Sequence, residues 1–202
     1  MAKYEPHDRF YRKARQRGLP SRAAFKIEEL LERFRLARPG ARVADLGCAP
    51  GGWLSILAAE VGPQGRVVGI DLAACSRLAP NVMVIAGDIR DPEKLAEVAQ
   101  ALGAKADLVT SDLAPKLSGV RERDQAQMLE LVLAASDFAR RILRPGGSAI
   151  AKIFMGDDFK QALDVYRLDF RQVDAVRTRA SRPGSSELYL VARDFRAEEF
   201  RG

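Results

Sequence analysis

The apolar residues of this chain follow two periodicities that alternate along most of its length. Short apolar runs, typical of buried strands, occur at 43–46, 66–70, 82–85, 106–111, 148–154, 170–176 and 187–192. Amphipathic helical spacing is found between most of them, at 52–61, 92–102, 123–143 and 158–166. This alternation predicts an α/β fold with a mostly parallel, seven-stranded sheet covered by helices on both faces. No convincing helix separates the last two strands, so we expect a hairpin that adds an antiparallel strand.

One further amphipathic helix is predicted before the first strand, ending by Pro39-Gly40. Its apolar face follows the i, i+3, i+4, i+7 rule, with Ile27, Leu30, Leu31 and Phe34. Ser21 is the expected N-cap, because its side chain can accept a backbone hydrogen bond in the first turn. Lys26 is about 100° around the helix from Ile27. It therefore stands at the edge of the apolar face and can reach into a cleft.

The net charge of +6 is concentrated near the N-terminus. Residues 1–42 contain 12 basic and 5 acidic residues, whereas the other 160 residues carry a balance of −1. Residues 1–20 read as an irregular basic arm, in which Phe10 and Tyr11 stand among arginines. Such an arm favours a polyanionic partner, a nucleic acid or a membrane surface, and its aromatic rings suit stacking on bases. The alternatives are a solvated tail and an arm that its aromatic residues attach to the domain.

The composition excludes several classes of protein. No apolar stretch approaches the roughly 20 residues that span a bilayer, and the basic N-terminus lacks the apolar core of a secretory signal. Two cysteines without metal-type spacing, and a single histidine elsewhere, exclude a disulfide scaffold and a zinc finger. We therefore expect a cytoplasmic protein without a metal site.

The segment 45–53, DLGCAPGGW, is the strongest local motif. It follows a strand and opens a helix, and its glycines allow a ligand to approach the backbone closely. It is neither a phosphate-binding P-loop nor a dinucleotide GxGxxG turn, since no Gly-Lys-Ser/Thr follows and Pro50 removes an N–H group. Asp45 would repel a phosphate but suits a cationic amino-acid moiety. We interpret Cys48 as a small residue in a tight loop rather than a nucleophile.

Two further acids follow the next strands along the chain. Asp71 ends the second predicted strand, where an acid accepts hydrogen bonds from ribose hydroxyls in doubly wound folds. Asp88 follows the third strand, in position to meet the edge of a base. An ammonium and carboxylate, a ribose and a base together describe S-adenosylmethionine. The sequence therefore predicts that this cofactor binds across the strand ends.

The chain resembles the FtsJ-like (RrmJ-type) ribosomal RNA 2′-O-ribose methyltransferases over essentially its full length. The matching segments are SRAAFKIEEL (21–30), DLGCAPGGW (45–53), GDIRD (87–91), SDLAPKLSG (111–119), AKIF (151–154) and SSELYLVA (185–192). The resemblance implies a doubly wound, Rossmann-like class I methyltransferase fold. It divides the chain into the basic arm, 1–20, and a methyltransferase domain, 21–202.

The family's catalytic Lys-Asp-Lys-Glu tetrad is intact in this chain. By resemblance its members are Lys26, Asp112, Lys152 and Glu187. The residues expected to bind the cofactor are Asp45, Gly47, Cys48, Pro50, Gly51, Gly52, Trp53, Asp71, Leu72, Asp88, Ile89 and Asp112. Lys152 is notable on its own, because it interrupts an otherwise apolar strand and buried lysine is rare.

Methyl transfer requires a ribose 2′-oxygen about 3 Å from the methyl carbon and in line with its bond to sulfur. The sequence leaves two roles open for Lys152. It either accepts the hydroxyl proton as a general base, with Asp112 orienting it, or stays charged and stabilises the developing alkoxide. Glu187 is expected to hold a lysine or the ribose, and Lys26 to orient the substrate.

The resemblance implies that the substrate is a uridine of large-subunit ribosomal RNA within a ribosomal particle. The enzyme is expected to be a monomer and not to bind membranes. A transfer RNA 2′-O-methyltransferase and a non-catalytic RNA-binding assembly factor are the alternatives. A nicotinamide-dependent dehydrogenase is disfavoured by Pro50. Four arginines near the last strand would extend the basic track past the site: Arg171, Arg177, Arg179 and Arg182.

Overall fold

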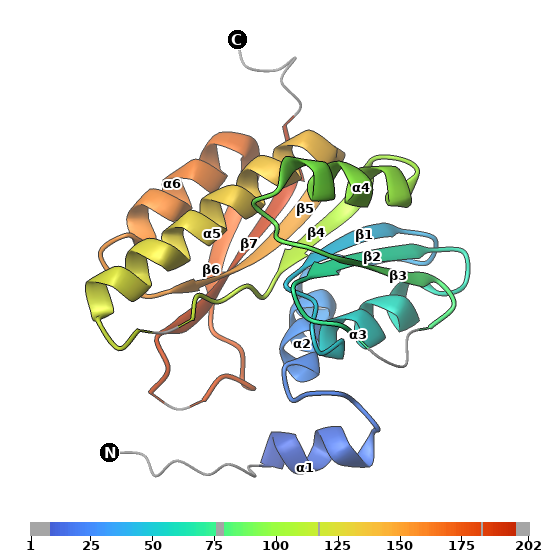
Figure 1. Cartoon of the computed structure of the whole chain (residues 1–202), viewed down its shortest axis with the longest axis horizontal. Helices are drawn as coiled ribbons and strands as arrows, with labels where there is room; N and C mark the ends of the chain where they lie inside the picture. The colour runs from blue at the N-terminus through green and yellow to red at the C-terminus, as the bar shows by residue number, and fades with distance from the viewer. Residues whose placement is uncertain (1–8, 76–78, 117, 183, 197–202) are drawn as a thin grey trace.

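The computed structural model describes residues 9–75, 79–116, 118–182 and 184–196 (Figure 1). Within these ranges seven strands form one sheet in the order β3-β2-β1-β4-β5-β7-β6. Their bounds are β1 (Arg42–Leu46), β2 (Arg66–Asp71), β3 (Val82–Ala86), β4 (Ala106–Ser111), β5 (Leu143–Phe154), β6 (Phe170–Val176) and β7 (Glu187–Phe195). Neighbouring strands are parallel except that β7 runs antiparallel to both β5 and β6. The predicted sheet and its terminal hairpin are confirmed.

Helices cover both faces of the sheet (Figure 1). Their bounds are α1 (Arg9–Gln16), α2 (Ala24–Phe34), α3 (Gly52–Val61), α4 (Pro92–Leu102), α5 (Arg121–Ile142) and α6 (Phe159–Asp169). One apolar cluster joins α2 and α3 to the sheet, and a second joins α4, α5 and α6 to its other face. Parallel strands buried on both faces read as continuous apolar runs, which is why the sequence pattern located them.

The chain winds in opposite directions from β1, since β2 and β4 are its two neighbours. Ligands of doubly wound sheets bind at this switch point, beyond the carboxyl ends of the parallel strands. We call that side of the sheet the carboxyl edge, and the side where β1, β2, β4 and β5 begin the amino edge. Because β7 is antiparallel, its first residue, Glu187, also lies at the carboxyl edge.

The predicted cap of α2 is wrong. Ala23 occupies the N-cap position and makes no side-chain capping hydrogen bond. Ser21 instead belongs to a preceding turn, in which its carbonyl accepts a hydrogen bond from the backbone N–H of Ala24. Its hydroxyl faces the start of α3, where a Cβ added to Gly52 would lie only 2.5 Å from it. Packing between α2 and α3 therefore fixes Ser21 before the helix begins.

The basic arm is also not irregular throughout, because residues 9–16 form α1. Ala14 is buried against Phe25 and Ala180, and the rings of Phe10 and Phe25 lie 5.8 Å apart. Arg17 pairs with Glu28 of α2. Residues 1–8 of the predicted arm lie outside the described residues. None of the helices in the described ranges is long and apolar enough to cross a bilayer.

Candidate functional site

The four predicted catalytic residues lie in one cluster at the carboxyl edge. Lys26 comes from the first turn of α2, and its Nζ lies 2.7 Å from the carboxylate of Glu187. Asp112 follows β4 directly, and Lys152 stands near the end of β5. The Nζ of Lys152 donates to the backbone carbonyl of Asp112 at 2.5 Å and lies 3.2 Å from its carboxylate. Four separate chain segments thus supply two lysine–carboxylate pairs.

Tyr189 joins the two pairs, and the sequence interpretation missed it. Its hydroxyl donates to Oδ1 of Asp112 at 2.8 Å and also interacts with Glu187. Burial, together with the charges of Asp112 and Glu187, raises the pKa of Tyr189 well above its ordinary value. The hydroxyl therefore stays protonated and acts as a fixed donor. Lys26 also lies over the tyrosine ring, 5.7 Å from its centroid.

Glu187 is ionised despite its position in the protein. Burial opposes the charge, but attraction to Lys26 and hydrogen bonds from Lys26 and Ser181 outweigh it and lower the pKa of Glu187. Ser181 donates to this carboxylate at 2.8 Å from the loop before β7. Arg22 donates to the carbonyl of the neighbouring Ala180. The start of α2 and the segment leading into β7 are therefore joined by two contacts, the Lys26–Glu187 ion pair and the hydrogen bond from Arg22 to Ala180.

A cavity of about 620 Å³ adjoins this cluster at the ends of β1, β2, β3 and β4. We call it the cofactor cavity. Half of the residues expected to bind the cofactor line it: Gly47, Asp71, Leu72, Asp88, Ile89 and Asp112. The volume lies within the range of small-molecule sites. Asp71, Asp88 and Asp112 line it at the ends of β2, β3 and β4. The sequence predicted acids at the ends of the first three strands, but the first of these, Asp45, does not line the cavity.

The other six expected cofactor residues do not line this cavity; they are Asp45, Cys48, Pro50, Gly51, Gly52 and Trp53. Most of them shape the loop from beneath. Cys48 is buried, and its Sγ lies 3.8 Å from that of Cys75. Gly51 caps α3 with φ 99°, and Gly52 begins the helix. Trp53 is buried and its indole N–H donates to the carbonyl of Ala23, while Pro50 is exposed in the loop.

Backbone geometry at the glycine loop shapes one wall of the cofactor cavity. Gly47 has φ 76°, and a Cβ there would approach the side chain of Leu113 to 2.8 Å. Only glycine therefore keeps this part of the cavity open. Asp71 accepts hydrogen bonds from the backbone N–H groups of Ala49 and Ala73 at 2.9 and 2.8 Å, which fixes the glycine loop against the end of β2.

Asp45 lies beneath the glycine loop and is 1% exposed. Its Oδ1 accepts a hydrogen bond from Thr110 at 2.7 Å, whereas its Oδ2 is buried without a partner among the described residues. Burial, reinforced by the nearby Asp112 and Asp71, raises the pKa of Asp45 to about 8 against the effect of the Thr110 hydrogen bond. A positively charged ligand nearby would favour its ionised form.

The sequence interpretation missed the far wall of the cavity. It consists of the segment after Asp112 and the exposed side of α5, with Leu113, Ala114, Pro115, Lys116, Arg123, Gln127, Glu130 and Leu131. The motif SDLAPKLSG contains the first part, but only its aspartate was assigned to the cofactor. The α5 residues carry no motif, and the turn that brings them here is set by Asp124, which accepts hydrogen bonds from Ser118.

No group of three or more histidine, cysteine or acidic side chains that could hold a metal ion occurs within the described part of the chain. The site brings together two lysines, two carboxylates and one tyrosine, and Asp112 also lines the cofactor cavity. Such a cluster can orient and polarise a hydroxyl group.

Two curated proteins similar to this chain carry the same name. A protein from Anaeromyxobacter sp., named ribosomal RNA large subunit methyltransferase E, is 45% identical over 198 residues, which cover 97% of this chain and 72% of the relative. The protein of that name from Myxococcus xanthus is 42% identical over 197 residues, with 97% and 92% coverage.

Solved structures show the same architecture. A putative ribosomal RNA methyltransferase from Plasmodium falciparum matches with a TM-score of 0.74 and 28% identity, covering 87% of this chain and 97% of that one. Aeropyrum pernix fibrillarin, solved with S-adenosyl-L-methionine natively bound, matches with a TM-score of 0.58 at 20% identity, over 84% and 73% of the two chains. The second likeness shows the fold alone.

A doubly wound sheet with this glycine loop, and with acids at successive strand ends, defines the class of S-adenosylmethionine-dependent methyltransferases. The particular group follows from the sequence match over residues 19–195. The chain belongs to the FtsJ-like methyltransferase family.

Proposed function

We propose that this enzyme methylates the 2′-hydroxyl of a uridine ribose in large-subunit ribosomal RNA, using S-adenosylmethionine. The names of the relatives support the RNA, and the paired lysines and carboxylates beside the cofactor cavity support the reaction. We further propose that it acts in the cytoplasm, as a monomer, on RNA within a ribosomal particle.

The contacts of Lys152 carry the mechanistic part of this proposal. The bound cofactor supplies a methyl group on a positively charged sulfur. Lys152 donates a hydrogen bond to the backbone carbonyl of Asp112 and forms an ion pair with its carboxylate at 3.2 Å. Both partners are acceptors, and an ammonium group has three N–H donors, so it can also donate to a substrate oxygen. Of the two roles open from the sequence, this geometry favours a charged Lys152 that stabilises the developing alkoxide while the hydroxyl proton passes to water.

The second pair orients the ribose. Lys26 and Glu187 are 12% and 14% exposed, so both remain reachable from the substrate side. Ser181 fixes the carboxylate from one side and Lys26 from the other. A carboxylate held in this way can accept a hydrogen bond from a ribose hydroxyl without moving. Positioning of this kind lowers the barrier because the reacting groups are already aligned.

Replacing Lys152 by alanine tests the proposal. We expect methyl transfer to large-subunit RNA to fall at least about 100-fold, while cofactor affinity measured by calorimetry stays near that of the wild type. Lys160→Ala, which removes an exposed lysine of α6, is the control. Mapping of 2′-O-methyl groups in the RNA product identifies the nucleotide. Full activity of Lys152→Ala would refute the mechanism, and a methyl group on a base would refute the proposed reaction.

A further inference from the structure

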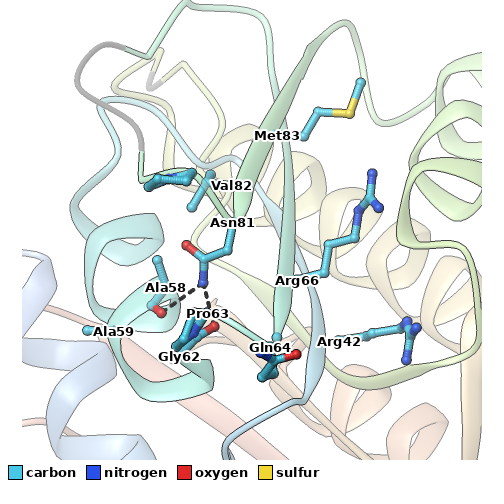
Figure 2. A pocket seen from close by; sticks show the side chains of 12 residues that line it. Arg42, Ala58, Ala59, Gly62, Pro63, Gln64, Arg66, Asn81, Val82 and Met83 are labelled. Atoms are coloured by element: carbon cyan, nitrogen blue, oxygen red, sulfur yellow. Dashed lines mark hydrogen bonds between the residues drawn. The ribbon is translucent and has the colours of Figure 1, made fainter.

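A second cavity lies at the amino edge of the sheet, at the opposite ends of the strands from the catalytic cluster (Figure 2). Its volume is about 710 Å³. The first residues of β1 and β2, the loop after α3 and the start of β3 line it. Two of its lining residues are arginines, and none of those that the structure describes is an aspartate or glutamate. The cavity is therefore electropositive.

The two arginines are neighbours across the sheet. Arg42 and Arg66 open β1 and β2 and are paired in register. Both side chains extend to the same side of the strands (Figure 2). Arg42 uses its Nε to donate to the carbonyl of Leu102 at 3.1 Å, which orients the guanidinium. Within the described ranges, Arg66 has no side-chain hydrogen bond or ion pair. Because Arg42 and Arg66 begin adjacent strands and extend to the same side, both guanidinium groups can approach one anion, which their charges would stabilise.

Local carboxylates do not neutralise this pair. The nearest acid along β4, Asp107, accepts hydrogen bonds from the guanidinium groups of Arg38 and Arg144. From Arg42 it receives only the backbone N–H. Several exposed arginines of the described chain pair with a carboxylate, as Arg171 does with Asp194. Within the described ranges the side chains of Arg42 and Arg66 make no such pair, so both charges can meet an anionic ligand.

The rest of the cavity is preformed and combines polar and apolar groups. Asn81 donates to the carbonyls of Ala58 and Gly62 at 3.0 and 2.9 Å, which fixes the loop after α3 (Figure 2). Pro63 and Met83 contribute apolar surface, and Met83 is 46% exposed. A flat apolar group can therefore pack beside the two cations. A phosphate attached to a planar base has this combination of properties.

We propose that this cavity binds one nucleotide of the substrate RNA, with a backbone phosphate between Arg42 and Arg66 and the base against Met83. The RNA would then contact both edges of the sheet. The identity of the ligand rests on the proposed function. A ribosomal RNA is large enough to extend from the carboxyl edge to the amino edge of the sheet. Lys105 and Arg144, which stand at the starts of β4 and β5, continue the basic surface along the same edge.

The double variant Arg42→Gln, Arg66→Gln tests the second contact. Losing one contact to a single-stranded phosphate reduces the slope of log K against log salt by about 0.7, which is the reduction we expect for the phosphate between the two arginines. At moderate salt the KM for RNA should rise about tenfold. The kcat and the cofactor affinity should stay unchanged. The matched control is Arg141→Gln, Arg167→Gln, which removes two exposed, carboxylate-paired arginines of α5 and α6.

Hydrogen exchange of the wild-type enzyme locates the contact without any substitution. Large-subunit RNA should slow exchange in residues 62–66 and 81–84. Uridine 5′-monophosphate at high concentration should shift the NMR signal of the Met83 methyl group, and the shift should be lost in Arg66→Gln. A double variant with the KM and salt slope of its control, or no protection of these segments by RNA, would overturn the second site. If the wild type fails to methylate ribosomal RNA at all, the proposed function fails instead.

Discussion

Replacing Asp45 by asparagine should change how the stability of the protein depends on pH. In the folded protein burial raises the pKa of this carboxyl from 3.8 to about 8. Between these values the native state keeps a proton that the unfolded chain releases. Stability is therefore fully present below the unfolded pKa and is lost as the pH rises toward the folded value. Asparagine has the same shape, can accept the hydrogen bond from Thr110 and does not titrate.

The size of this stability change follows from the pH range between the unfolded and folded pKa values of Asp45. Each pH unit between the two pKa values is worth about 1.4 kcal/mol of free energy of unfolding. From pH 5 to pH 7, the stability of Asp45→Asn minus that of the wild type should grow by about 3 kcal/mol. The free energy of unfolding of a typical domain is roughly 5–15 kcal/mol, so this change is a large part of it. The asparagine amide can lower stability by an amount that does not depend on pH, for example through an N–H group without a hydrogen-bond partner. Such a cost shifts the stability difference equally at every pH and leaves its slope against pH unchanged.

The assay is urea unfolding of both proteins without cofactor at several pH values. Asp88→Asn is the control, because hydrogen bonds from Arg90 lower the pKa of Asp88. That carboxyl is ionised in both states above pH 5, so its difference curve should be flat. A flat curve for Asp45→Asn as well would show that Asp45 is ionised in the folded protein, and the reasoning from its burial would be refuted.

Three further perturbations test other parts of the structure. Tyr189→Phe removes the donor to Asp112, so kcat should fall about tenfold while the KM for RNA is unchanged, and steady-state kinetics on ribosomal RNA would reveal it. Phe25→Ala removes the ring that α1 packs on and should cost about 3 kcal/mol in urea unfolding; a loss below about 1 kcal/mol would show that α1 is not docked. Deleting residues 1–20 should weaken RNA binding and flatten its salt dependence with cofactor affinity retained, and an unchanged salt slope would show that the segment makes no phosphate contacts.

The sheet could be predicted from the sequence because its central strands are buried on both faces. Val43, Ala44, Leu46 and their neighbours are apolar without interruption, and the observed strands begin and end within a few residues of the expected ones. The exception is β5, which begins at Leu143 rather than at residue 148 and includes the Arg-Pro-Gly-Gly segment before the expected strand. A register shift opposite β4 accommodates these residues, and local sequence does not encode it.

Contacts between distant segments account for what the sequence did not predict. Helix α1 has eight residues, too few to be stable alone, and it depends on packing against Phe25 and Ala180. Tyr189 reads as an ordinary aromatic residue of a buried strand. Its function comes from a partner 77 residues away in sequence, Asp112, which only the sheet brings next to it. Motif resemblance located the four charged residues, but it did not identify the group that joins them.

The antiparallel direction of β7 is required to assemble the cluster of Lys26, Asp112, Lys152, Glu187 and Tyr189. In register, Phe154 is opposite Glu187, and Lys152 is opposite Tyr189. A parallel β7 of the same nine residues would place its first residue at the amino edge, about 27 Å from the end of β5 at 3.4 Å per residue. A shift of one residue in the antiparallel register would turn Tyr189 to the opposite face of the sheet. The terminal hairpin thus fixes both the edge and the face at which Glu187 and Tyr189 meet Lys26 and Asp112.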